Sequence, residues 1–312
     1  MSDYEVLIAS DTTSRPDSEE RNVSGLVLHG APFRRAEGMS VAALNTGRAL
    51  NSRPPQNPPP KKNAPEHILR AFNTWAFKRE QPSDPQLMLQ VIAEATAHGR
   101  PLPFLFYWGK GPRCKIDEPD IKCLDYLAAF AHRVSAVYEP GAAMKLIFTD
   151  THARLNGYSE LGIRAYCSAI EAEAHQRGFE CCSLSELIEK TQAKAEDYAD
   201  DIVPEDMLAK LCASAMKWYH GADSAERGAV TYFHMNMIEK RAVELSFPKA
   251  IFTTFNSSKF RILFPKRLPI FYMYSLQRGV SVKPWFLPTE ARPCDDSSCQ
   301  CRSGNPDIAD RP

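Results

Sequence analysis

The chain has 312 residues, of which 44% are hydrophobic and 24% are charged. Both values are typical of a globular protein with enough chain for a sizeable core. The 38 basic residues balance the 38 acidic residues. This balance argues against a dedicated nucleic-acid coat or a membrane-surface protein, which would carry a basic excess. We therefore expect no nucleic-acid partner.

Three features of the sequence bear on its compartment. No apolar run reaches the roughly 18–20 residues that a membrane-spanning helix needs. The first five residues are acidic and lack the basic and apolar regions of a secretory signal. The nine cysteines are scattered through a long chain, whereas small secreted scaffolds concentrate them. These features predict a cytoplasmic protein with reduced cysteines and no membrane partner.

The two ends of the chain differ in composition from its middle. Six prolines lie between Pro54 and Pro65, and such a segment favours extended polyproline II over a packed core. The last twenty or so residues are polar and rich in proline. We predict a flexible N-terminal arm over residues 1–64, a catalytic α/β domain over 65–290 and a flexible tail over 291–312.

Helical periodicity begins after this arm. Apolar residues between Ile68 and Ala76 recur at three- and four-residue spacing, which places them on one face of a helix. A second helix is predicted from the cap Asp84 to the stop at Gly99. Ser183 and Glu186 have the spacing of a capping box and predict another helix start. The same periodicity predicts helices over 120–138, 159–177, 205–220 and 225–245.

Short apolar runs between these helices predict strands. Residues 102–108 form an aromatic run that ends at Gly109 and favours a buried strand. Further strands are predicted over 143–149, 179–183, 249–255, 261–264, 270–276 and 280–282. Strands and helices that alternate with short loops are typical of a parallel layer. The predicted fold class is α/β, a Rossmann-like, mostly parallel sheet with flanking helices, a helical segment and a strand-rich C-terminal part.

The loop after the first strand contains Gly109, Lys110, Gly111 and Arg113, with Lys115 just beyond. Open α/β sheets bind ligands outside the carboxyl ends of their strands. Glycines on both sides of a lysine let the backbone approach a ligand closely, and their amides can help to hold an anion. The spacing is neither that of a GxGxxG fingerprint nor that of a P-loop. A plain glycine turn with a solvated lysine is the alternative.

The loop predicted after the next strand carries Asp150, His152 and Arg154 within five residues. An acid, an imidazole and a guanidinium at a strand end could orient a substrate amine, move protons and bind phosphate. The alternative interpretation is that Asp150 caps the loop and that His152 is a surface residue.

Charge is unevenly distributed in the second half of the chain. Residues 246–288 contain no acid and carry seven Lys or Arg, among them Lys259 and Arg261. These cations are either the outward positions of half-buried strands or part of an anion site. Residues 186–206 hold eight acids, which we interpret as a solvated helical face and loop.

Patterns for metal and hydrolase chemistry are weak. Cys294, Cys299 and Cys301 lie together but lack the second pair of ligands that a zinc finger uses. The adjacent Cys181 and Cys182 are interpreted as packing residues. No H-E-x-x-H or G-x-S-x-G motif occurs. We expect no metal and no cofactor.

Over residues 68–286 the sequence resembles the pyoverdine/dityrosine biosynthesis family, the isocyanide (isonitrile) synthases, as a divergent member. The likeness rests on the Pro-x-Pro strand and lysine loop of 101–115, on the Tyr-Glu-Pro-Gly-Ala run of 138–142, on the strand and Asp loop of 147–154, and on the Lys-Pro-Trp-Phe run of 283–286. Family members commonly have Ser-Asp-Gly-Arg with a second acid nearby. This chain has Thr-Asp-Thr-His-Ala-Arg instead, and Asn156 stands where the acid would be.

The resemblance implies an enzyme that needs no metal and converts an amino acid amine to an isocyanide, with ribulose 5-phosphate as carbon donor. It also implies amino acid and sugar-phosphate substrates and a pathway partner of the iron/2-oxoglutarate oxygenase class. The catalytic candidates are Lys110 as general base, His152 as proton shuttle and Asp150 as the group that orients either the substrate amine or His152. The phosphate- and substrate-binding candidates are Arg113, Lys115, Arg154, Asn156, Lys259 and Arg261.

Two alternatives from other classes stay open at this point. One is a non-catalytic protein that binds phosphate or a metabolite in the same pocket. The other is an adaptor that holds a partner through the proline-rich arm and the acidic helix.

Overall fold

The structure is a computed structural model that describes residues 64–109, 111–112, 115–194, 204–220 and 224–284. The predicted arm and tail lie outside these residues, as do Lys110 and Arg113. The proposed domain bounds therefore stay predictions. All the elements below belong to one compact unit of the chain.

Five parallel strands form the central sheet, in the order β3-β2-β1-β4-β5. Their bounds are Leu102–Trp108 (β1), Ala142–Phe148 (β2), Glu180–Ser183 (β3), Ile251–Thr254 (β4) and Ile270–Tyr272 (β5). Strands β1 and β2 pair along their whole length, with Trp108 opposite Phe148 at the end. Both strands therefore finish at the same level. The parallel sheet with its helices confirms the predicted α/β, Rossmann-like fold class.

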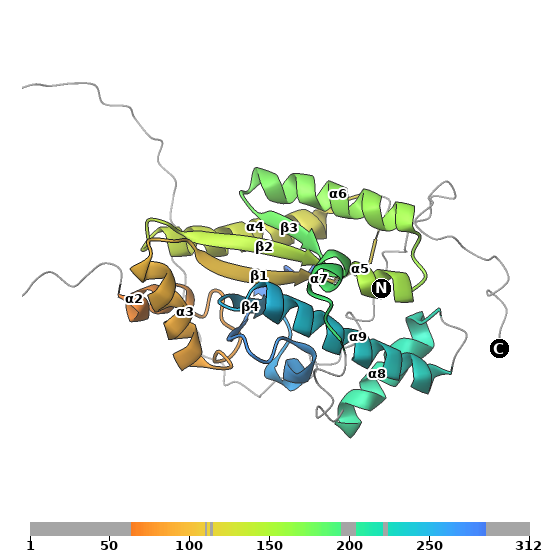
Figure 1. The fold of residues 1–312 in the computed structure, drawn as a ribbon. Helices are drawn as coiled ribbons and strands as arrows, with labels where there is room; N and C mark the ends of the chain where they lie inside the picture. Colours follow the sequence, from red (N-terminus) through yellow and green to blue (C-terminus); the bar gives the residue numbers. More distant parts are fainter. Residues whose placement is uncertain (1–63, 110, 113–114, 195–203, 221–223, 285–312) are drawn as a thin grey trace, which may run out of the picture. The chain divides into compact units, whose positions relative to one another are not determined.

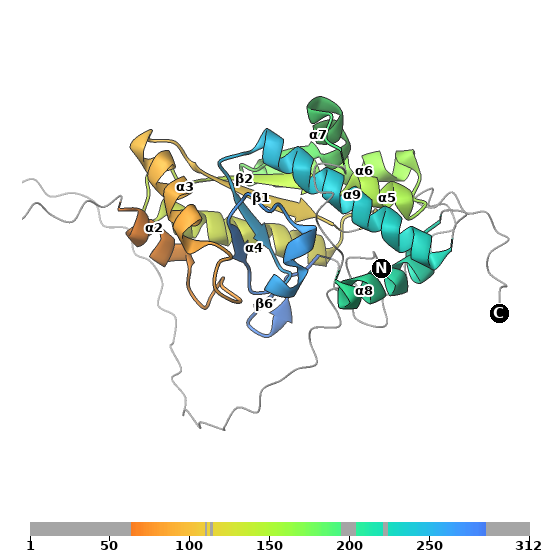
Figure 2. The ribbon, with the colours of Figure 1, turned by 60° about the horizontal axis from the view of Figure 1, so that its bottom comes forward.

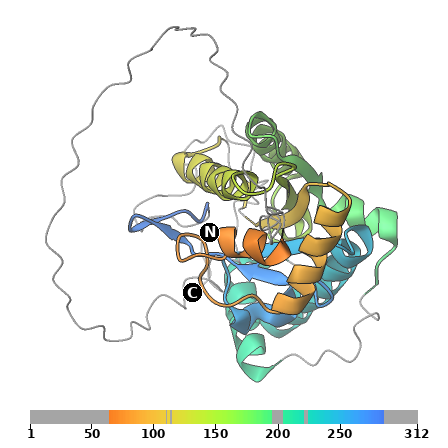
Figure 3. The ribbon, with the colours of Figure 1, turned by 90° about the vertical axis from the view of Figure 1, so that its left-hand side faces the viewer.

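Helices cover both faces of this sheet (Figures 1 and 2). Helices α4 (Glu118–Ser135) and α6 (Glu160–Gln176) pack on one face, while α7 (Leu184–Thr191) and α9 (Ala225–Ser246) pack on the other. Helix α8 (Glu205–Trp218) packs against α9. In Figure 3, α2 (Pro65–Phe72) and α3 (Pro85–Ala97) lie nearest the viewer, at the end where the strands begin.

The core is divided by the sheet into two clusters. Phe104 and Phe106 of β1 point into the cluster that contains α4 and α6, whereas Leu105 and Tyr107 point into the cluster that contains α7 and α9. In a strand that is buried on both faces, successive side chains all face apolar surroundings, so polar and apolar residues do not alternate. This explains why the sequence of β1 is a continuous apolar run.

Several helix starts follow the capping signals of the sequence. The Asp84 carboxylate accepts a hydrogen bond from the Leu87 backbone N–H at 2.9 Å and begins α3. Ser183 and Glu186 form the predicted capping box at α7. A second capping box, between Asp117 and Asp120, begins α4. Each cap satisfies backbone N–H groups that the first helical turn leaves without partners.

The strand predicted over 261–264 is wrong. Residues Ser258–Leu263 form a 3₁₀ helix, η2, in which Phe260 and Leu263 are buried. Their three-residue spacing places both side chains on the same face of the short helix. The Arg261 guanidinium then donates to the carbonyl oxygens of Phe264, Pro265 and Lys266, which fixes the turn that follows.

The predicted strand over 270–276 is too long. Strand β5 stops at Tyr272, because the next residues pair with the segment before α3: Met273 bridges Lys78 and the Tyr274 N–H donates to the Phe77 carbonyl. Residues Leu276–Gln277 (β6) and Val280–Ser281 (β7) form a separate antiparallel hairpin.

Two further findings concern helices. Helix α2 ends at Phe72, earlier than the apolar spacing predicts, and Trp75 beyond it is 80% exposed. Among the helices that the structure describes, none combines the length and the apolar character needed to cross a bilayer.

Candidate active site at the carboxyl edge of the sheet

Buried polar residues gather where the strands end. The strand order reverses between β1 and β4, and open α/β sheets bind ligands outside the carboxyl ends of their strands at such a point. In Figure 1 the β2 arrow points towards α5 (Asp150–Leu155), which follows it directly. The buried polar residues after β2, at and after the end of β4, and on the facing helix α9 include Thr149, Asp150, Thr151, His152, Asn156, Thr254, Asn256, Ser257, Asn236, Glu239 and Lys240.

The residues after β2 form a helix, so the predicted loop is wrong. Helix α5 begins at Asp150, one residue beyond Thr149. Because α5 contacts α6, α7 and α9, the side chains of its first three residues, Asp150, Thr151 and His152, are buried. Asp150 and His152 are each only 4% exposed. The interpretation of His152 as a surface residue therefore does not hold.

His152 is paired with Glu239 of α9. The His152 Nδ1 atom lies 2.8 Å from Glu239 Oε1, and the Thr151 hydroxyl donates to the same oxygen. The Glu239 side chain is completely buried. Since a carboxylate only accepts hydrogen bonds, Nδ1 carries the proton and Nε2 of a neutral ring keeps its lone pair. The ring is thus held in the tautomer that a general base needs, with an anion behind it to stabilise the protonated form.

A second group of contacts fixes the plane of the imidazole. The ring stacks on Tyr232 with centroids 5.7 Å apart and planes 11° apart. The Asn236 side-chain nitrogen lies 3.5 Å from His152 Nε2 and donates to the Tyr232 carbonyl at 2.8 Å. The Tyr232 hydroxyl donates to Asn156 Oδ1 at 2.7 Å. Asn156, predicted to bind substrate, thereby connects the end of α5 to α9.

Three buried oxygens at this edge have no hydrogen-bond partner among the described residues: Glu239 Oε2, Asn256 Oδ1 and Ser257 Oγ. Leaving a buried acceptor unpaired costs free energy, on the order of 1–3 kcal/mol for a neutral group and more for a charged one. Glu239 belongs to the His152 pair, while Asn256 and Ser257 follow β4 directly. A ligand with hydrogen-bond donors would satisfy such oxygens.

Asp150 and Arg154 form a separate ion-paired group. The Arg154 guanidinium contacts Asp150 Oδ2 and Glu160 Oε1, each at 2.5 Å. The Ser185 backbone N–H donates to Asp150 Oδ1 at 3.1 Å, and the Ser185 hydroxyl donates to Oδ2. The hydrogen bonds that Arg154 donates to Glu160 and, secondarily, to Asp150 hold the pKa of Arg154 above its ordinary value. In this arrangement Arg154 holds α5 against α6 and is already matched by two carboxylates.

A polar cavity of about 300 Å³ adjoins this group, between α6, β3 and α7. Asp150, Arg154, Glu160 and Arg164 line it together with three thiols, Cys167, Cys181 and Cys182. Burial raises the pKa of the Cys167 and Cys181 thiols to about 12 and that of Cys182 to about 11. These thiols are therefore protonated near neutral pH and are weak nucleophiles.

The contacts of His152 described above involve none of the other predicted site residues. Lys110 and Arg113 lie outside the described residues. Lys115 and Lys259 are exposed, and Lys259 lies on η2 rather than on a strand. Arg261 donates hydrogen bonds to backbone carbonyls of its own turn, so some of its N–H groups stabilise that turn.

The partners of His152 were missed in the sequence. Tyr232, Asn236 and Glu239 are spaced by four and three residues on α9, which places them on one face of the helix. This polar stripe on the buried face of α9 was the available signal in the sequence. In the parts of the chain that the structure describes, no three His, Cys, Asp or Glu side chains converge as metal ligands would.

Comparison with known proteins finds neither a matching family model nor a matching curated protein. Among solved structures, the fold is similar to the crystal structure of the PvcA protein from Pseudomonas aeruginosa, with a TM-score of 0.50. The two chains share 16% identity over 68% of this chain and 83% of that one. At this identity the likeness establishes a common α/β fold.

Proposed function

We propose that the protein is a biosynthetic enzyme that converts an amino acid amine into an isocyanide and takes the isocyanide carbon from ribulose 5-phosphate. Two findings support the class of reaction: the sequence patterns of the β1 and β2 ends, and the fold shared with PvcA, a protein of the pyoverdine/isocyanide synthase family. The observation that carries the proposal is the buried His152–Glu239 pair at the carboxyl edge of that fold.

The chemistry requires a base at several steps. The amine attacks the ketone of the sugar phosphate, and loss of water gives an imine. Removal of protons then allows phosphate to leave, and cleavage of both carbon–carbon bonds that flank the former ketone carbon releases the isocyanide. An imidazole has an ordinary pKa of about 6.5 and changes charge near neutral pH. His152, oriented by Glu239, is in our proposal a base for these proton transfers, alongside Lys110.

The binding roles that we propose for the basic residues differ from those that the sequence predicted. Because Arg154 is engaged by Asp150 and Glu160, we assign it to positioning α5. We assign the phosphate to the loop after β1, through Lys110, Arg113 and Lys115. This loop begins at Gly109, at the level where β2 also ends. An iron/2-oxoglutarate oxygenase that processes the product is part of the same proposal.

The test is carbon transfer from a labelled sugar. Full-length protein is incubated with proteinogenic amino acids and ¹³C-labelled ribulose 5-phosphate, and products are analysed by mass spectrometry. We expect a product that carries one labelled carbon on the amine nitrogen. His152→Ala should lower the rate by about 10²- to 10⁴-fold, as expected for loss of a positioned base. His175→Ala, an exposed histidine on α6, is the matched control and should react like the parent protein.

Two results would count against the proposal. Absence of labelled carbon in any product would overturn the activity. Saturable binding of ribulose 5-phosphate without turnover would instead favour a metabolite-binding protein. If labelled product forms at an unchanged rate in a folded His152→Ala variant, the activity stands but the role of His152 is wrong.

A further inference from the structure

A second cavity lies at the opposite edge of the sheet, where the strands begin. It has a volume of about 380 Å³. It is lined by α3, by the first halves of β1 and β2, by Glu180 at the start of β3 and by the segment that leads from α9 into β4. Small-molecule sites typically occupy roughly 300–1,000 Å³. The cavity shares no lining residue with the His152 site and is large enough for a ligand of its own.

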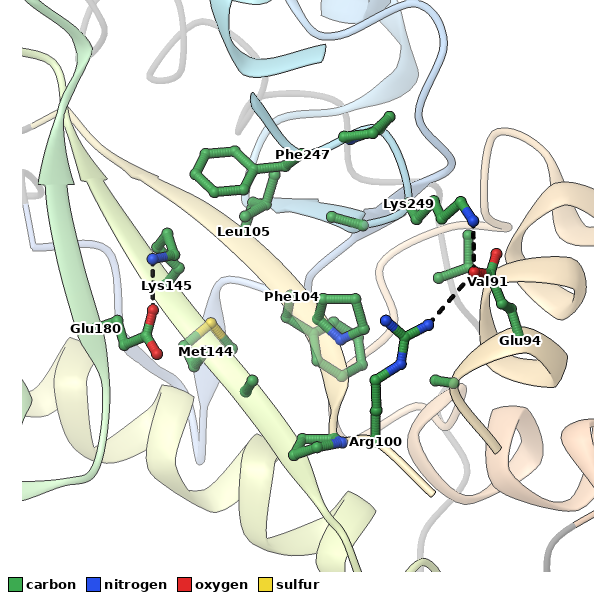
Figure 4. A pocket seen from close by; sticks show the side chains of 16 residues that line it. Val91, Glu94, Arg100, Phe104, Leu105, Met144, Lys145, Glu180, Phe247 and Lys249 are labelled. Carbon is green, nitrogen blue, oxygen red and sulfur yellow. Dashed lines mark hydrogen bonds and ion pairs between the residues drawn. The ribbon is translucent and has the colours of Figure 1, made fainter. Parts of the chain in front are cut away.

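The walls of this amino-edge pocket are apolar. Figure 4 shows Phe104, Leu105 and Met144 in its middle, with Phe247 on one side and Val91 on another. The remaining apolar lining residues are Ala95, Pro101, Pro103, Ala143, Pro248 and Ala250. Removal of a ligand's apolar surface from water against such walls stabilises binding by about 25 cal/mol per Å². The body of the ligand is therefore hydrophobic.

Charged side chains stand at two ends of the pocket (Figure 4). At one end, Glu94 Oε1 accepts from Lys249 Nζ at 2.6 Å and from Arg100 Nη2 at 3.3 Å. At the other end, Lys145 Nζ lies 2.5 Å from Glu180 Oε2. The Lys145–Glu180 end is thus balanced, whereas the Glu94 end sets two cations against one carboxylate.

The Glu94 end is suited to an anion. The hydrogen bond from Lys249 lowers the pKa of Glu94, so this carboxylate is ionised at neutral pH and one positive charge is left over. Arg100 offers five N–H donors in a planar fork, and Glu94 engages it through Nη2. A carboxylate can be bound by such a fork through two parallel hydrogen bonds. The Arg100 and Lys249 side chains are 59% and 67% exposed, so both can turn towards a ligand.

We propose that the amino-edge pocket binds an amphipathic monocarboxylate. Its apolar body lies against Phe104, Met144 and Phe247, and its carboxylate is held by Arg100 and Lys249. The inference rests only on the lining residues of this pocket and is independent of the activity proposed above. A cationic ligand would meet the surplus positive charge, and a neutral one would leave the Arg100 fork unused.

Isothermal titration of the full-length protein with octanoate tests the proposal. Octanol and octylammonium have the same apolar body and serve as matched probes. We expect saturable binding of octanoate and binding at least about 5-fold weaker for octanol and octylammonium, because one exposed charge-assisted contact is worth on the order of 1 kcal/mol. Equal affinity for the three probes, or no saturable binding of octanoate, would overturn it.

Four variants assign the contacts. Arg100→Gln should weaken octanoate binding about 5- to 10-fold, and Glu94→Gln should strengthen it by releasing both cations. Ala143→Trp, at an exposed position of the lining, should block the pocket while the circular dichroism spectrum stays that of the parent. Lys122→Gln, on the exposed face of α4, is the control and should bind octanoate normally. Unchanged binding in both Arg100→Gln and Ala143→Trp would place octanoate elsewhere and overturn the assignment.

Discussion

One carboxylate oxygen of Glu239 accepts hydrogen bonds from two donors, and the other oxygen accepts none from the described residues. Its Oε1 atom accepts from His152 and Thr151, while Oε2 is buried without a partner in the described structure. One carboxylate therefore both supports the local fold and sets the tautomer of His152. These two roles can be separated, because a glutamine of the same shape keeps an acceptor but not the negative charge.

Substitution of Glu239 should reveal this separation. Glu239→Ala leaves two buried donors unpaired and should lower the free energy of unfolding by about 2–4 kcal/mol. Glu239→Gln should cost less stability, yet lower kcat, because no anion then stabilises the protonated imidazole. Urea unfolding and the carbon-transfer assay measure the two effects. Glu118→Ala, an exposed residue of α4, is the control. Equal kcat for Glu239→Gln and the parent would contradict the electrostatic role.

The three partly buried thiols predict a dependence of stability on alkaline pH. Burial raises the pKa of Cys167 and Cys181 from 9.0 to about 12. Between these values the unfolded chain loses thiol protons that the native state keeps. The unfolded state then binds fewer protons, so the free energy of unfolding falls as pH rises above about 9.

Urea unfolding at pH 8, 9 and 10 tests this dependence. The parent protein should lose stability over this range more steeply than a Cys167→Ala/Cys181→Ala variant. Comparison of the two slopes removes the contribution of lysines and tyrosines, which are the same in both proteins. Parallel slopes would show that these thiols do not titrate differently in the folded and unfolded states.

At the scale of elements, the sequence correctly predicted those helix starts and strands that depend on residues close together in the chain. Capping residues such as Asp84 and Ser183 predicted helix starts correctly, because a capping side chain bonds to backbone N–H groups only a few residues away. The apolar run of β1 predicted a buried strand correctly, because the run itself is a local feature of the sequence. The predictions for the segments after β2 and β4 were wrong, because α5 packs on α7 and α9 and η2 packs on α9, and these contacts are not local in the sequence. The contact between His152 and Glu239 joins residues 87 positions apart, which no local pattern contains.

Two glycines on either side of α6 offer a matched test of how α5 is held. Gly157 and Gly178 both have positive φ, 72° and 74°, a conformation that costs an L-residue on the order of 1 kcal/mol. A Cβ at Gly157 would lie 2.7 Å from the His220 ring, whereas one at Gly178 would meet open space. Gly157→Ala should therefore destabilise the protein clearly more than Gly178→Ala in urea unfolding. Equal losses would mean that His220 moves aside at no cost.

At the scale of the whole molecule, the two faces of the sheet are closed by different parts of the chain. One hydrophobic cluster begins at Ile68 and reaches Val282, and the other extends from Leu105 to Tyr272. The candidate active site and the amino-edge pocket lie at opposite ends of the same strands. Strand β1 contributes to both, through Pro103 near its start and through the loop that follows Trp108 at its end.

The proline-rich composition before Pro65 predicts that the first 60 residues are dispensable for folding. Among the described residues, both clusters draw on positions 68–282, and α2 begins at Pro65 with its own proline start. A protein lacking residues 1–60 should keep the circular dichroism spectrum of the full chain and a melting temperature within a few degrees of it, since a change of 1 kcal/mol corresponds to roughly 2–4 °C for a domain of this size. Limited proteolysis of the full chain should leave a core that begins near residue 60. An insoluble or unfolded product after the deletion would show that the arm contributes to the fold.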